Sequence, residues 1–110
     1  MSYSMKGTTI TLTRGDTFIA QIELTDPNGN PYTPVEGDSI TFAAKRSYND
    51  AAALIFKEIP IDTLKLVLDP EDTKPLDFGQ YVYDIQIVFS TGAVDTFITK
   101  AKLIITEEVH

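Results

Sequence analysis

The sequence predicts an all-β protein: an antiparallel β-sandwich of about seven strands with one short helical turn. Three observations predict this class. Apolar and polar residues alternate with a period of two along most of the chain, turn signals recur at a spacing of roughly 8 to 14 residues, and a single segment carries the residues that start a helix. Because 110 residues suffice for one hydrophobic core and not for two, we expect residues 1–110 to form a single domain.

Seven segments show the alternation that a strand with one buried face requires. The clearest is residues 80–89, where tyrosine, isoleucine and phenylalanine alternate with mostly polar residues. The last segment is the longest, and we expect it to be bent or bulged near Lys100. Residues 1–7 are expected to be flexible. The seven predicted strands are residues 8–13, 17–25, 38–46, 54–59, 63–68, 80–89 and 93–106.

Turn-forming residues separate these strands. The tripeptide RGD at 14–16 predicts a hairpin turn. The run DPNGN at 26–30 is the strongest turn signal, because Asn-Gly tolerates positive φ and proline sets its own φ. Residues 31–37 lack a strand period, which indicates a crossing between two sheets. The run DPED at 69–72 predicts a helix start with aspartate as N-cap and proline at the first position, and Pro75 ends that helix within about two turns.

The start of the sixth strand carries a more specific pattern. Immunoglobulin-type domains place a short helical turn and then Gly-x-Tyr at this point, and the tyrosine hydrogen-bonds back to the chain a few residues upstream. Gly79 and Tyr81 match that pattern, so we assign them to a structural corner. The sequence therefore predicts an immunoglobulin-like sandwich. It lacks the antibody hallmarks, because Tyr83 stands at the cysteine position and Phe42 replaces the tryptophan of the third strand.

Composition excludes several functional classes. Sixteen acidic against nine basic residues give a net charge of -7, which argues against binding nucleic acid or an anionic membrane. The chain has no cysteine, and its one histidine is the final residue, His110. Thiolate nucleophiles, histidine-based triads and zinc sites are therefore excluded. We expect no catalytic residue, no cofactor and no metal site, and hence no enzyme.

Acidic and amide residues offer the remaining candidates for a metal or acid–base site. Asp26, Asn28 and Asn30 alternate like the first ligands of a calcium loop, but the sixth and twelfth positions carry proline and glycine instead of glycine and glutamate. The densest acidic cluster is better explained by helix capping at an exposed corner. This cluster consists of Asp69, Glu71, Asp72 and Asp77.

Five residues are candidates for an interface. Ile19, Val82 and Val88 depart from the polar alternation, so we expect them to mark an apolar patch on the outside of the sandwich. Tyr32 and Tyr48 fall in predicted loops, where exposed rings suit a protein interface and also suit sugar binding. The first and last predicted strands are candidates for the open edges at which copies could pair.

Several phrases, in order, carry a family resemblance: RGDTF at 14–18, DPNGNP at 26–31, GDSITF at 37–42 followed by Lys45, and GQYVYDI at 79–85. Their order and spacing resemble a group of small prophage proteins of Gram-positive bacteria. Those proteins have immunoglobulin-like folds and are similar to the N-terminal domain of phage baseplate upper proteins. The resemblance covers the chain from about residue 8 to residue 106.

The resemblance implies a virion structural protein of a phage tail or baseplate, prophage-encoded and made in the cytoplasm of the bacterial host. It implies action through protein–protein assembly, with other phage structural proteins as partners and with a homo-oligomer as a further possibility. A second reading of the residues is a carbohydrate- or cell-surface-binding β-sandwich module. In that case Tyr32 and Tyr48 would stack on sugar rings.

Overall fold

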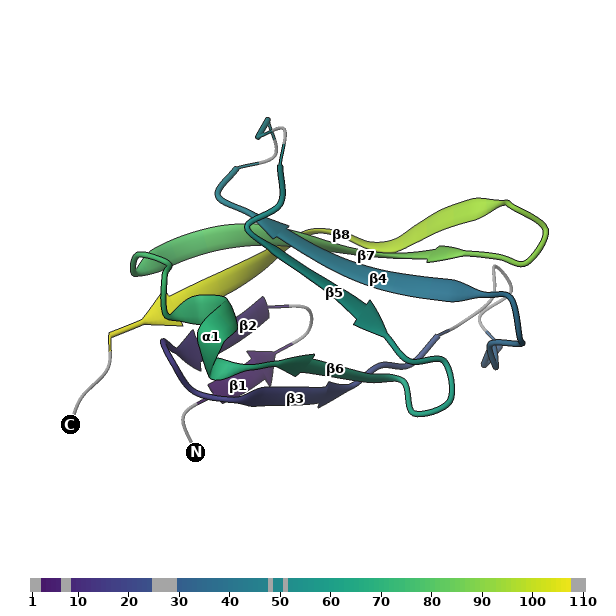
Figure 1. The fold of residues 1–110 in the computed structure, drawn as a ribbon, viewed down its shortest axis with the longest axis horizontal. Helices are drawn as coiled ribbons and strands as arrows, with labels where there is room; N and C mark the ends of the chain where they lie inside the picture. The colour runs from purple at the N-terminus through teal and green to yellow at the C-terminus, as the bar shows by residue number, and fades with distance from the viewer. Residues whose placement is uncertain (1–2, 7–8, 25–29, 48, 51, 108–110) are drawn as a thin grey trace.

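A computed structural model describes residues 3–6, 9–24, 30–47, 49–50 and 52–107. Within these residues the chain forms eight strands and one short helix, arranged as two sheets that face each other across a common core (Figure 1). The predicted all-β sandwich with one helical turn is confirmed. The elements are β1 (Tyr3–Lys6), β2 (Thr9–Thr13), β3 (Phe18–Gln21), β4 (Ser39–Lys45), β5 (Ile55–Ile59), β6 (Lys65–Leu68), α1 (Pro70–Thr73), β7 (Gly79–Val88) and β8 (Val94–Thr106).

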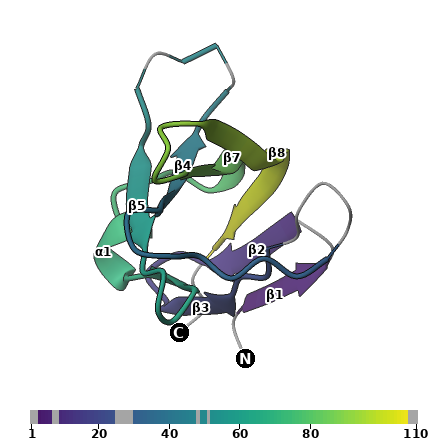
Figure 2. The same ribbon diagram turned by 90° about the vertical axis from the view of Figure 1, so that its right-hand side faces the viewer.

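The two sheets differ greatly in size. One has six strands in the order β1-β2-β8-β7-β4-β5, and the other contains only β3 and β6. Figure 2 shows the larger sheet curving around the core, so that β1 and β2 come down beside β3 while β4 and β5 lie on the other side. The smaller sheet and α1 close the remaining part of the sandwich (Figure 1).

One pairing differs from the predicted antiparallel arrangement. Strands β2 and β8 run parallel, with Ile10 opposite Leu103 and Leu12 opposite Ile105, whereas the other pairs are antiparallel. Nearly the whole chain separates these two strands, so no hairpin sets their relative direction. Alternation along a strand indicates which residues are buried, and it carries no information about the direction of the neighbouring strand.

Part of the segment expected to be flexible, residues 1–7, forms a strand. Residues 3–6 form β1, which pairs antiparallel with β2 from Tyr3 opposite Leu12 to Lys6 opposite Thr9. An uncovered β2 would leave a row of backbone donors and acceptors unpaired, and β1 satisfies them. As a consequence, β2 and β8 are interior strands rather than edges, and the edges of the larger sheet are β1 and β5.

The turn at 14–16 is present, but it is not a hairpin. The Asp16 amide donates to the Thr13 carbonyl oxygen at 3.1 Å, and Gly15 adopts a φ of 84°. Strand β2 belongs to the larger sheet and β3 to the smaller one, so this turn carries the chain across the sandwich. A sequence signal for a turn does not distinguish these outcomes, because both need the same reversal of the backbone.

The core lies between the two sheets and follows the predicted alternation. From the smaller sheet, Phe18, Leu66 and Leu68 point inward. At the centre of the core, the rings of Phe42 and Tyr83, both from the larger sheet, pack at a centroid distance of 5.1 Å. Burial raises the pKa of Tyr83 to about 12. The larger sheet contributes Ile10, Leu12, Ile40, Phe42, Ala44, Ile55, Ile59, Tyr81, Tyr83, Ile85, Ile87, Ala101, Leu103 and Ile105.

Strand β8 is bulged where the sequence predicts an irregularity. Tyr83 pairs with Ala101, but Ile85 pairs with Ile98 and Gln86 with Thr96, so β8 carries extra residues against β7 on both sides of Ile85. The segment lies beside Lys100, as predicted. Extra residues of this kind bend the strand and increase its twist, which suits the curvature of the larger sheet.

Candidate interaction surfaces

The predicted corner is built around Tyr81. Its hydroxyl donates a hydrogen bond to the carbonyl oxygen of Asp77 at 2.7 Å, which is the bond that the Gly-x-Tyr pattern predicts. The guanidinium of Arg46 lies over the Tyr81 ring, 4.7 Å from its centroid. Gly79 has a φ of 131°, and a Cβ there would lie 3.1 Å from a guanidinium nitrogen of Arg46. Through these contacts, Gly79 and Tyr81 hold the start of β7 in place.

The acidic cluster at α1 is also engaged within the fold. The ammonium of Lys57 lies 3.2 Å from a carboxylate oxygen of Asp69 and 2.9 Å from one of Asp72. The Asp69 amide donates to the Asp72 carboxylate at 2.7 Å, as capping of a helix start requires. The hydrogen bond to Asp72 raises the pKa of Lys57. The carboxylates thus join α1 to β5.

Tyr32, an expected interface residue, contacts two other residues of the fold. Its hydroxyl donates to the carboxylate of Asp38 at 2.6 Å, and its ring meets Phe89 edge-on at a centroid distance of 5.7 Å. Asp38 is buried and also accepts from the amides of Val35 at 3.0 Å and Ser90 at 2.9 Å. The hydrogen bond from Tyr32 lowers the pKa of Asp38, and the same bond raises the pKa of Tyr32.

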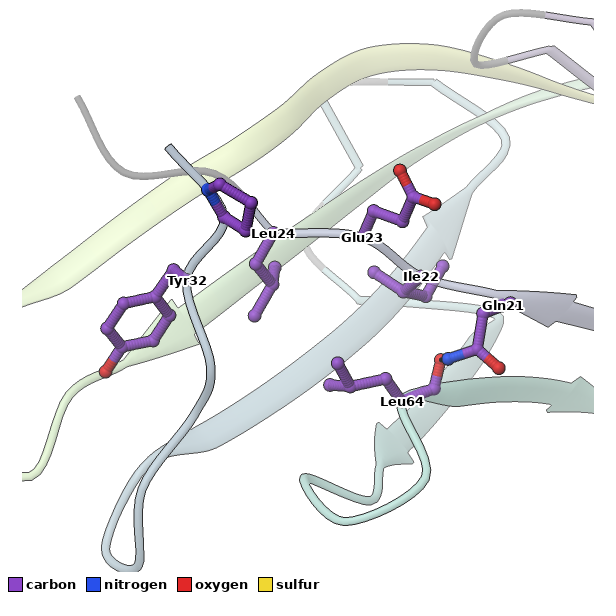
Figure 3. Close-up of a pocket in the computed structure, with 7 residues that line it drawn as sticks. Gln21, Ile22, Glu23, Leu24, Tyr32 and Leu64 are labelled. Carbon is purple, nitrogen blue, oxygen red and sulfur yellow. Dashed lines mark hydrogen bonds between the residues drawn. The ribbon is translucent and has the colours of Figure 1, made fainter. Parts of the chain in front are cut away.

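A pocket of about 460 Å³ lies next to Tyr32 at this end of the sandwich (Figure 3). Ile22, Leu24 and Leu64 supply much of its apolar lining, and Gln21 and Glu23 add polar groups. The Gln21 side-chain amide donates to the Thr63 carbonyl oxygen at 2.9 Å. Two polar groups of the lining, the Gln21 amide and the Tyr32 hydroxyl, are thus engaged within the fold. Tyr48, the other candidate for sugar stacking, lies outside the described residues.

The outside of the smaller sheet carries one apolar pair. Ile19 of β3 and Val67 of β6 are direct cross-strand partners, with 48% and 37% of their surface exposed. Ile19 is thus on the outside, as its departure from the alternation predicts. This face is small, because each of its two strands has four residues.

Val82 and Val88 lie on the outside of the larger sheet, both half-buried. Val82 sits between Lys45 of β4 and Lys102 of β8, while Val88 pairs with Val94 near the β7–β8 turn. The two are six residues apart on one strand, which corresponds to about 20 Å. Since Ile19 lies on the opposite sheet, the expectation of one patch shared by Ile19, Val82 and Val88 is wrong. The alternation of apolar and polar residues indicates that a side chain points outward, but it does not indicate which of the two sheets the residue belongs to.

Sequence reasoning missed the most exposed of the large apolar side chains described. Phe56 of β5 is 64% exposed, and Val94 of β8 is 59% exposed. A signal for Phe56 was present: Ile55, Lys57 and Ile59 share one parity, and the isoleucines are buried, so Phe56 has the outward parity. Lys57 obscures this pattern, because it points inward and its charge is satisfied by α1.

Among the residues that the structure describes, no group of three acidic, histidine or cysteine side chains is placed to hold a metal ion. In the same part of the chain, no helix has the length and hydropathy of a membrane-spanning segment. A comparison with models of known protein families and a search of curated proteins found no match to this chain. The exposed apolar side chains described above make the outer faces of the sandwich candidate interaction surfaces.

Proposed function

We propose that this protein is a prophage-encoded structural component of a phage particle and that it acts in the tail or baseplate by binding other proteins. The observation that carries the binding role is the exposed Phe56 ring on the outer face of the larger sheet. Large aromatic side chains on an uncovered sheet face are enriched at protein interfaces. The assignment to a phage particle is supported by the resemblance of the segments at 14–18, 26–31, 37–42 and 79–85 to small prophage proteins.

The proposal involves no catalytic step. Three of the acidic groups are used to hold the fold: Asp38 accepts three hydrogen bonds, and Asp69 and Asp72 bind Lys57. Hydrogen bonds and ion pairs of this kind stabilise one conformation of the chain. A rigid β-sandwich with an accessible face suits a building block of an assembly.

The experiment is to induce the prophages of the source bacterium, purify particles on a density gradient and quantify this protein by mass spectrometry. We expect it to co-sediment with tail and capsid proteins in a fixed ratio well above trace. An abundant cytoplasmic enzyme of the host, followed in the same fractions, measures contamination. Absence from intact particles, or a ratio no higher than that of the host enzyme, would overturn the proposed function.

A further inference from the structure

We propose that this protein binds a second copy of itself through the outer face of β8, β7, β4 and β5, with Phe56 of each copy seated in a hollow on the other. The inference rests on the proposed assembly function and adds the surface and the partner. Three features of this face support it: a projecting ring beside a hollow, a balanced charge, and sufficient size.

The projecting ring and the hollow lie next to each other. A hollow of about 120 Å³ opens on this face, lined by Ala43 and Lys45 of β4 and Val82, Tyr83 and Asp84 of β7. Phe56 is the direct cross-strand neighbour of Ala43, yet it does not line the hollow and remains 64% exposed.

The hollow is large enough to admit part of an aromatic ring. A cavity of about 150 Å³ is known to hold a benzene molecule, so a hollow of this size accepts part of a phenylalanine ring. A knob and a hole on the same face are the condition for a two-fold contact, in which each copy supplies both parts.

The charge of this face favours another copy of the same acidic chain. The described outward side chains on these four strands include two lysines, Lys45 and Lys102, and two acids, Glu58 and Asp84. Their formal charges cancel, whereas the whole chain carries -7. Two such faces do not repel each other as two purely acidic surfaces would, and each face presents both signs of charge to the other.

The size of the face distinguishes it from the smaller sheet. Four strands about 4.8 Å apart and some nine residues long cover roughly 19 by 30 Å, which is of the same order as the 800 Å² that each partner buries in a standard interface. The outside of β3 and β6 covers only about 10 by 13 Å by the same reckoning. The larger face also carries the apolar side chains of Val82, Val88, Val94 and Ile104, distributed along β7 and β8.

The test is analytical ultracentrifugation of the purified chain over roughly 1 to 300 µM, a range that detects weak dimers. We expect a monomer–dimer equilibrium in the wild type. Phe56→Asp is expected to leave a monomer, and Ala43→Ile, which fills the hollow, to weaken the dimer by about tenfold or more. Ile19→Asp is the matched control for Phe56→Asp, because it places the same charge on an exposed apolar position of the other sheet.

A second pair of variants tests the charge argument. Lys102→Glu and Lys65→Glu change the net charge equally, and both lysines are exposed, but Lys65 lies on the smaller sheet. We expect Lys102→Glu to weaken the dimer by about tenfold at low salt and Lys65→Glu to change it by less than about threefold. Thermal unfolding of each variant serves as the control for folding. We expect the variants at exposed positions to unfold cooperatively, because an exposed side chain contributes little to the core.

Two results would overturn the inference: a wild type that stays monomeric throughout, or a dimer that responds to Ile19→Asp and Lys65→Glu but not to Phe56→Asp and Lys102→Glu. These results are separate from the particle experiment. A monomer that is present in particles overturns this inference alone, and a dimer with the expected variant pattern that is absent from particles overturns only the particle assignment.

Discussion

The two ends of β7 are each held by a tyrosine hydroxyl, but the acceptors differ. At the start of the strand, Tyr81 donates to a backbone carbonyl oxygen, that of Asp77, at 2.7 Å. Beyond its end, Tyr32 donates to the carboxylate of Asp38 at 2.6 Å, and the same carboxylate binds the Ser90 amide at 2.9 Å. The start of β7 is thus held by a neutral carbonyl oxygen that accepts from one side chain. The other end is held by an ionised carboxylate that accepts from several donors.

This difference shows two ways to close the ends of a sandwich. The corner at Tyr81 is local, because donor and acceptor are four residues apart. The contact at Asp38 joins three segments, since its partners come from the loop at 31–37 and from the turn after β7. Hydrogen bonds to an ionised group are stronger than neutral ones, but they can be titrated.

Removal of the carboxylate is expected to have the largest effect on stability. Asp38→Ala leaves the Tyr32 hydroxyl and the amides of Val35 and Ser90 without their acceptor. We expect a loss of unfolding free energy roughly two to three times that caused by Tyr81→Phe, because three donors are affected rather than one. Urea unfolding followed by circular dichroism measures both. Asp62→Ala removes the same charge from an exposed position and serves as the control; an equal loss there would mean that net charge, not the hydrogen bonds, is responsible.

Glycine substitutions compare the same two ends through the backbone. Gly37 has a φ of 98°, and a Cβ added there would lie 2.8 Å from the Cβ of Ser90. At Gly79 a Cβ would meet the end of the Arg46 side chain, which can move aside. Both variants incur the left-handed penalty of about 1 to 2 kcal/mol, and Gly37→Ala adds a clash. We therefore expect Gly37→Ala to lower the midpoint of thermal unfolding more than Gly79→Ala; the reverse order would contradict this account.

Tyr81→Phe is expected to have a smaller effect. The variant keeps the ring and its contact with Arg46 but removes the hydroxyl that donates to Asp77. A loss of about 1 kcal/mol in unfolding free energy is expected for one neutral hydrogen bond. Chemical denaturation measures it, with the slope of the transition checked for a constant value. No loss would mean that the bond does not contribute to the stability of the corner.

The smallest expected effect is a pH dependence confined to the Asp38 end. The pKa of Asp38 is lowered from its ordinary 3.8, so its contribution to stability is complete above that value and is lost as pH falls through the folded-state pKa. We expect the difference in unfolding midpoint between wild type and Asp38→Asn to shrink below about pH 4. The difference between wild type and Tyr81→Phe should stay constant over the same window, because its acceptor does not ionise. If the difference in unfolding midpoint stayed constant with pH for Asp38→Asn as well as for Tyr81→Phe, the proposed contrast between an ionised and a neutral acceptor would be contradicted.

The sequence alone determined the features that depend on near neighbours. Period-two alternation predicted seven strands and their buried faces, and proline and aspartate predicted α1. The corner at Tyr81 and the irregularity near Lys100 also follow from local residues. Of the candidate surfaces, the outward positions of Ile19, Val82 and Val88 were predictable, because a strand residue of the wrong polarity signals its face.

The tertiary structure alone decided which strands meet. It made β2 and β8 parallel interior strands, ordered residues 3–6 as β1, and placed Ile19 on a different sheet from Val82. It also engaged Tyr32 with Asp38 and left Phe56 exposed beside a hollow. The physical reason is that alternation records how deeply each side chain is buried, whereas strand pairing and surface shape depend on residues far apart in the chain.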